Sequence, residues 1–89
     1  MKSKMICFSS NLKNNIKDWV LDKNGECFVS WINETIDSSL EIQENENDFW
    51  ELTLFKYDKN GIIKDEIIII ESDNKEEIVD LTIDFMKNN

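Results

Sequence analysis

The sequence contains no alanine, arginine, proline or histidine, and it has only two glycines and two cysteines. Without histidine, and without a CxxC spacing between Cys7 and Cys27, nothing resembles a zinc site. The missing residue types use G- and C-rich codons, whereas the abundant Ile, Asn and Lys use A- and T-rich codons. The composition therefore indicates an AT-rich bacterial or phage genome. We interpret both cysteines as reduced, buried thiols, with a disulfide between them as the alternative.

Long apolar runs are also absent. No segment approaches the ~20 apolar residues that span a bilayer. The first ten residues, MKSKMICFSS, lack the apolar run and the small-residue cleavage site of a signal peptide. These absences predict a soluble cytoplasmic protein. A length of 89 residues predicts a single domain over 1–89.

Positive charge is scarce, because ten lysines face nineteen carboxylates and the net charge is -9. A charge of this sign repels nucleic acid and anionic membranes and favours basic surfaces. The expected partner is therefore a basic protein, such as a nuclease or another nucleic-acid-binding protein. Direct contact with nucleic acid or a membrane is not expected.

Catalytic and metal-binding patterns are missing as well. The tetrapeptide DKNG occurs at Asp22 and again at Asp58, and it resembles the start of an EF-hand calcium loop. Such a loop needs Gly at position 6 and Glu at position 12, but the first copy has Cys27 and Asn33 there and the second copy has Ile69 at position 12. A reactive thiol needs an electropositive setting, which the apolar neighbours of the cysteines do not supply. We predict no catalytic residue, no cofactor and no metal.

The N-terminal pattern predicts a helix over about 11–23. Leu12, Ile16, Trp19 and Val20 have the spacing of one helical face. Ser9, Ser10 and Asn11 offer N-cap side chains, and Gly25 can end the helix in a left-handed conformation. The alternative makes the first DKNG a hairpin between the strands WVL and ECF.

The second DKNG predicts a β-hairpin between FWELTLFKY and IIKDEIIII, with Asn60 and Gly61 in a two-residue type I′ turn. Facing positions then sum to 121, a register that pairs opposite charges and like apolar groups. The unbroken apolar run 67–70 predicts a strand covered on both faces. The predicted pairs are Lys56 with Asp65, Leu54 with Ile67, Leu52 with Ile69, Thr53 with Ile68, and Tyr57 with Lys64.

The remaining elements complete the predicted fold. Residues 26–33 and 36–42 indicate two strands, although a helix over 26–43 also fits their spacing, and 44–48 form a polar connection. A helix over about 74–87 has N-cap candidates before it and acidic residues in its first turn. We therefore predict an α+β fold with the order α-β-β-β-β-α, in which an N-terminal and a C-terminal helix pack on an antiparallel sheet of three to four strands.

Acidic residues are segregated along the chain. Residues 24–55 contain eight acids and no lysine. Same-face carboxylates two residues apart on a strand lie ~6.6 Å apart, near the spacing of successive phosphates, and such a row could occupy a basic groove meant for nucleic acid. The alternative is a solvated, solubilising face, and helix capping explains the later acids Glu71, Asp73, Glu76 and Glu77. The candidate partner-binding residues are Asp37, Glu41, Glu44, Glu46, Asp48 and Glu51.

Aromatic residues offer a second surface. Phe49 and Phe55 share one face of the strand FWELTLFKY, opposite Trp50. If only one face of the sheet is covered, these rings form an exposed patch that could mediate a homodimer. A helix over 11–23 lying on that face would instead bury them.

The tail from Phe49 onward is a hairpin around DKNG followed by ESDNKEEIVDLTIDFMKN. This arrangement over 49–88 resembles the hairpin and capped helix that end small acidic phage anti-CRISPR proteins that inhibit Cas9. The resemblance implies a protein that blocks a nuclease by covering its DNA-binding groove. Glu71, Asp73, Glu76 and Glu77 match that ending in character, whereas the acid-rich middle of the chain departs from the pattern.

Together these features lead to one functional hypothesis with two alternatives. The hypothesis is a non-enzymatic, phage-encoded inhibitor that acts in the host cytoplasm and mimics nucleic acid toward a basic protein. The first alternative is an immunity protein or antitoxin that neutralises a basic toxin through the same charge complementarity. The second is a structural dimerisation module.

Overall fold

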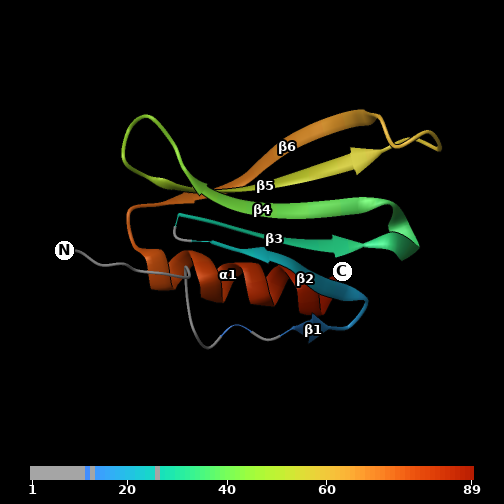
Figure 1. The fold of residues 1–89 in the computed structure, drawn as a ribbon. Helices are drawn as coiled ribbons and strands as arrows, with labels where there is room; N and C mark the ends of the chain where they lie inside the picture. The colour runs from blue at the N-terminus through green and yellow to red at the C-terminus, as the bar shows by residue number, and fades with distance from the viewer. Residues whose placement is uncertain (1–11, 13, 26) are drawn as a thin grey trace.

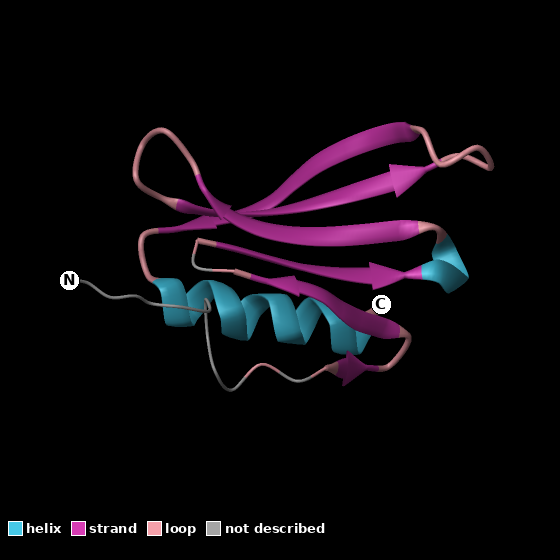
Figure 2. Cartoon of the chain, viewed as in Figure 1, coloured by secondary structure: helices cyan, strands magenta, loops and turns pink. Residues whose placement is uncertain are grey.

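A computed structural model describes residue 12 and residues 14–25 and 27–89 of the chain. This part of the chain forms an antiparallel sheet whose strands follow one another in chain order, with one long helix lying across a single face (Figures 1 and 2). β1 and β6 are the edge strands. The elements are β1 (Asn15–Ile16), β2 (Trp19–Asn24), β3 (Phe28–Asn33), the 3-10 helix η1 (Glu34–Ile36), β4 (Ser38–Glu44), β5 (Trp50–Tyr57), β6 (Ile63–Ser72) and α1 (Lys75–Asn88).

The α+β class is confirmed, but the predicted order α-β-β-β-β-α and the predicted sheet of three to four strands are wrong, because the described residues form a six-stranded sheet. Among the described residues the helix expected over 11–23 is replaced by β1 and β2; residues 11 and 13 lie outside them. Ile16 faces Trp19 across a tight turn in which Lys17 has a φ of 55°. A two-residue turn places residues three apart on the same face, as a helix does, so the spacing of these two core residues fits both structures. Val20, by contrast, is 51% exposed.

The first DKNG belongs to a β-hairpin, as the alternative interpretation proposed. Asp22, Lys23 and Asn24 lie in β2, and the Gly25 N–H donates a hydrogen bond of 2.7 Å to the Phe28 carbonyl at the start of β3. The pairing shifts between Leu21 and Lys23, so Asp22 forms a bulge. The Cys27 thiol in this turn is free and exposed rather than buried, and Cys7 lies outside the described residues.

The second DKNG turns a hairpin, but not with the predicted type I′ geometry, which requires positive φ at both Asn60 and Gly61. Only Gly61 has positive φ, at 79°. The Asp58 carbonyl accepts a hydrogen bond from the Gly61 N–H at 3.0 Å, and the Asp58 N–H donates to the Ile62 carbonyl at 2.9 Å. The loop is therefore Lys59 to Gly61, one residue longer than predicted. The Asp58 carboxylate completes it by accepting from the Asn60 and Ile62 N–H groups at 2.8 and 3.0 Å.

The register of β5 and β6 is confirmed in the middle of the hairpin and wrong at its two ends. Two irregularities in β6 cause the differences, because each bulge shifts the pairing by one residue. The confirmed pairs are Lys56 with Asp65, Leu54 with Ile67 and Thr53 with Ile68, whereas Leu52 faces Ile70 and Tyr57 faces Ile63.

The core lies between α1 and one face of the sheet. In β3 and β4, Val29, Trp31, Leu40 and Ile42 alternate with residues that point to the opposite face. Leu52 of β5 continues this layer, and Ile78 and Met86 of α1 pack against it with no exposed surface. The ring of Trp19 lies 6.4 Å from that of Phe85 in α1. We call this the helix face and the other the open face. None of the helices in the described residues is long and apolar enough to cross a bilayer.

The sequence predicts α1 well, because its start carries strong local signals. The Asn74 side chain accepts a hydrogen bond from the Glu77 N–H at 2.9 Å, and Glu76 and Glu77 place negative charge in the first turn. Replacing Asn74 by alanine should lower the free energy of unfolding by about 1 kcal/mol, because it removes this cap. Urea denaturation followed by circular dichroism measures the change. Asn88→Ala removes an exposed side-chain bond at the other end of α1, and should cost less than about 0.5 kcal/mol.

Two expectations about burial are wrong. β6 is an edge strand, and Ile67 and Ile68 are 43% and 56% exposed rather than covered on both faces. The aromatic patch of Phe49 and Phe55 does not form, because Phe55 is only 9% exposed although no helix of the described chain covers its face. Phe49, which precedes β5, is exposed on its own. The charged run from Lys64 to Glu66 and the bulges protect the free edge against pairing with other strands.

Candidate functional site

The six predicted partner-binding acids occupy three places. Glu44, Glu46, Asp48 and Glu51 lie at or near the loop that joins β4 to β5. Glu41 is in the middle of β4 on the open face, and Asp37 precedes β4 at the opposite end of the sheet. The predicted row of same-face carboxylates along one strand is missing from β4, because Gln43 follows Glu41 on the open face. The structure thus separates Asp37 and Glu41 from the other four.

The topology brings a larger set of acids together at one end of the molecule. In Figure 1 the β4–β5 loop and the connection from β6 to α1 lie at the same end of the sheet. Antiparallel pairing places Glu51 directly opposite Glu71 there. Among the described residues, Lys75 contributes positive charge to this region. Its ammonium lies 5.9 Å from the centre of the Trp50 ring. We call this region the acidic end; it comprises Glu44, Glu46, Asp48, Glu51, Glu71, Asp73, Glu76 and Glu77.

Asn45 organises the acidic end, although it is not among the residues predicted from the sequence. Its side-chain amide donates hydrogen bonds to the carboxylates of Glu51 at 3.1 Å and Glu71 at 3.0 Å, and so bridges two like charges on adjacent strands. Its carbonyl oxygen accepts from the Phe49 N–H at 3.1 Å and from the N–H of residue 47 at 2.9 Å. Asp48, at a φ of 64°, completes the turn. The signal was present in the sequence, because Asn is favoured at the first position of such turns.

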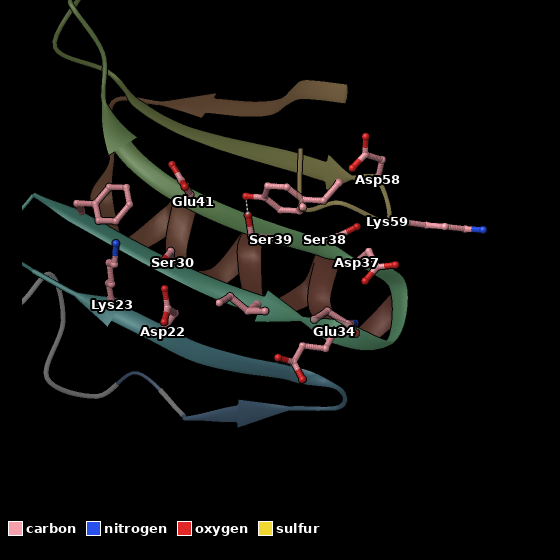
Figure 3. Close-up of a pocket in the computed structure, with 15 residues that line it drawn as sticks. Asp22, Lys23, Ser30, Glu34, Asp37, Ser38, Ser39, Glu41, Asp58 and Lys59 are labelled. Atoms are coloured by element: carbon pink, nitrogen blue, oxygen red, sulfur yellow. Dashed lines mark hydrogen bonds between the residues drawn. The ribbon is translucent and has the colours of Figure 1, made fainter. Parts of the chain in front are cut away.

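The open face carries a groove of about 430 Å³, which is the second candidate site (Figure 3). Small side chains form its floor: Ser30 and Ser39 are 4% and 5% exposed, although no helix of the described residues covers them. The Ser39 and Tyr57 hydroxyls are hydrogen-bonded to each other at 2.9 Å. Larger side chains on β2, β4 and the β5–β6 turn surround this floor. Its lining includes five carboxylates, Asp22, Glu34, Asp37, Glu41 and Asp58, and two lysines, Lys23 and Lys59.

Glu41 is the carboxylate most affected by this groove. It lies on β4 opposite Ser30 of β3 and Thr53 of β5, and it is half-buried. Burial raises the pKa of its carboxyl, the positive charge of Lys23 lowers it, and the negative charge of Glu66 on β6 raises it again. Burial is the largest of the three effects. The carboxylate therefore lies in a setting that penalises its charge.

Replacing Glu41 by glutamine should stabilise the protein at neutral pH. Because the raised pKa makes the folded state bind the proton more tightly than the unfolded chain, the free energy of unfolding falls as the pH rises from the ordinary value of 4.5 through the raised value. At pH values above the raised pKa, Glu41→Gln removes the free-energy cost of burying a charged carboxylate, so the variant should be more stable than the wild type. Below pH 4.5 the variant and the wild type should be equally stable. Urea denaturation across this pH range measures the difference.

Glu46→Gln provides the matched control for that experiment, because it removes the same charge from an exposed position in the β4–β5 loop. A Glu41→Gln variant that is less stable than the wild type at pH values above the raised pKa would contradict the assignment of a burial penalty to Glu41.

The sequence did not predict the groove, because its floor consists of residues far apart in the chain. Ser30, Ser39 and Tyr57 have no motif in common, and the antiparallel pairing of β3, β4 and β5 brings them together. No group of three or more metal-ligating side chains occurs in residues 14–25 and 27–89. The groove thus offers hydroxyl groups, an apolar wall from Phe28 and Ile32, and an excess of negative charge.

Comparison of the chain with protein-family models, with curated protein sequences and with solved structures gives no significant match.

Proposed function

We propose that the protein is a non-enzymatic inhibitor, encoded by a phage or mobile element, that uses its acidic end to bind the nucleic-acid-binding surface of a basic protein. The observation that supports this proposal is the convergence of eight carboxylates from the end of β4, the β4–β5 loop, β5, β6, the β6–α1 connection and the start of α1. The inhibitor acts in the host cytoplasm, and its carboxylates take the place of nucleic-acid phosphates.

The geometry of the acidic end supports this kind of recognition. Directly paired positions on neighbouring strands are about 5 Å apart, so the Glu51 and Glu71 carboxylates present two adjacent negative charges. Asn45 holds both of them in place, which lowers the entropy that would be lost when a partner orders them. The charges on the β4–β5 loop and at the N-terminus of α1 extend this surface in two directions. A groove rich in lysine or arginine would be complementary in charge to the whole acidic end.

The proposal predicts binding that depends strongly on salt and competes with nucleic acid. The tagged full-length chain would be used to capture proteins from a bacterial lysate at about 50 mM salt, with elution by increasing salt. The eluted protein would then be mixed with a fluorescent oligonucleotide. We expect a basic nucleic-acid-binding protein that elutes by about 300 mM salt and loses the oligonucleotide when this chain is added.

Two outcomes would contradict the proposal. Retention of the partner at high salt would mean that apolar contacts rather than charge hold the complex. Failure to displace the oligonucleotide would mean that the acidic end does not occupy the nucleic-acid site. Capture of a basic toxin that binds no nucleic acid would favour the immunity-protein alternative instead.

A further inference from the structure

We propose that the groove on the open face binds an extended organic polycation, of the linear polyamine class. This inference concerns a site separate from the acidic end and does not depend on the proposed function. It rests on three observations about the groove, namely the placement of its carboxylates, an unpartnered hydroxyl on its floor, and the position of its two lysines.

The carboxylates of the groove lie at its two ends. Figure 3 shows Asp22 and Glu41 toward one end and Asp37 and Asp58 toward the other. A hydrogen bond of 2.9 Å from the Tyr57 N–H to the Asp37 carbonyl holds Asp37 beside the β5–β6 turn that carries Asp58. Because Asp37 directly precedes β4 and Glu41 is the fourth residue of that strand, their Cα atoms lie roughly 12 Å apart. One small cation cannot reach both ends, whereas a linear chain with ammonium groups at its termini can.

The floor between these ends suits the middle of such a chain. The Ser30 hydroxyl has no hydrogen-bond partner in the described part of the chain, although Ser30 is only 4% exposed. This hydroxyl opens into the groove, where it could accept a hydrogen bond from an ammonium or secondary amine of a ligand. Phe28 and Ile32 supply apolar surface for methylene groups. The volume of about 430 Å³ belongs to an open groove, which suits an extended ligand.

The lysines of the groove do not neutralise it. The Lys59 side chain points away from the groove in Figure 3. Lys23 of β2 is paired with Ser30 of β3 and lies on the groove side. Its positive charge is close enough to lower the pKa of Glu41. Lys23 is therefore an internal competitor for a bound cation at the Glu41 end, and its removal should strengthen binding.

The experiment is a titration of the ¹⁵N-labelled full-length chain with spermidine, a linear triamine, followed by amide chemical shifts at constant ionic strength. We expect shifts at Ser30, Ser39 and Tyr57 on the groove floor. Glu41→Gln should weaken binding about tenfold, because it removes a charge-assisted contact. Lys23→Gln should strengthen binding severalfold.

Three controls make the result decisive. Glu46→Gln removes the same charge outside the groove and should change the affinity less than about twofold. Asp37→Asn removes charge from the far end, at a residue with a φ of 49° where Asn is well tolerated. This variant should weaken spermidine binding but leave the binding of n-butylamine, a single cation, unchanged, and it tests the site independently of Glu41→Gln.

The proposal is overturned if Glu41→Gln and Glu46→Gln weaken spermidine binding equally, because the binding would then reflect net charge alone. It is also overturned if spermidine binds no more tightly than n-butylamine, or if the shifts occur only at the acidic end.

Discussion

Replacing Trp31 by alanine is expected to destabilise the protein by about 3–5 kcal/mol. Trp31 lies in the middle of β3, between Leu21 of β2 and Leu40 of β4, and its side chain has no exposed surface. A domain of 89 residues has a total stability of about 4–13 kcal/mol. This one substitution therefore removes between about a quarter and all of that stability.

The contrast with phenylalanine sharpens this prediction. The Trp31 indole Nε1 is buried and has no hydrogen-bond partner among the described residues. A buried donor without an acceptor costs about 1–3 kcal/mol. Trp31→Phe keeps most of the apolar contact and removes this donor, so its cost should be well below that of Trp31→Ala.

Urea denaturation followed by far-ultraviolet circular dichroism measures both variants, and an unchanged m-value would show that the denatured state is the same. Val20→Ala provides the control, because Val20 is on the neighbouring strand β2 but is 51% exposed. Its cost should stay below about 1 kcal/mol. A Trp31→Ala variant that loses no more stability than Val20→Ala would contradict the packing of α1 on this face of the sheet.

Reversing three charges of the acidic end is expected to weaken binding of the captured partner at least about 100-fold. The variant combines Glu44→Lys, Glu46→Lys and Asp73→Lys. These three side chains are exposed, and Asn45 binds none of them, so the β4–β5 loop should keep its conformation. Each change replaces an attraction by a repulsion, and like charges brought together at an interface cost several kcal/mol.

The matched control reverses three charges elsewhere on the surface. Asp18→Lys lies in the β1–β2 turn, and Asp80→Lys and Asp84→Lys lie on exposed positions of α1. The two triple variants have the same net charge, so their difference measures the position of the charges. We expect the control to weaken binding less than about tenfold, through long-range electrostatics alone. Equal losses in competition with a fluorescent oligonucleotide would show that the acidic end is not the binding surface.

The sequence predicted elements whose signals are local. α1 was predicted within about one residue at each end, because Asn74 caps it and its acidic first turn and apolar stripe are continuous in the chain. The strands β3, β4, β5 and β6 were also predicted, from apolar alternation and from branched and aromatic residues. Asn45 could also have been predicted from local signals, because its role as a turn residue depends only on the residues that follow it.

The errors occurred where two structures produce the same pattern. Ile16 and Trp19 face the core together, either as neighbours on a helix or as partners across a two-residue turn. The spacing alone cannot separate these structures, and the packing of both residues against the rest of the core decides in favour of the hairpin. The bulges in β6 have a similar origin, because the isoleucines at 67–70 are interchangeable in the sequence and the register shifts among them.

By itself, the sequence determined the charge of the protein and predicted the strands and the helix from residue 28 onward. These properties follow from composition and from periodicity over a few residues. Only the tertiary structure decided which carboxylates lie together. Antiparallel pairing brings Glu51 next to Glu71 and leaves Asp37 at the far end of the sheet, and it joins Ser30, Ser39 and Tyr57 into one groove floor. Contacts of this kind depend on strand order and register, which arise from the packing of the whole core rather than from any local run of residues.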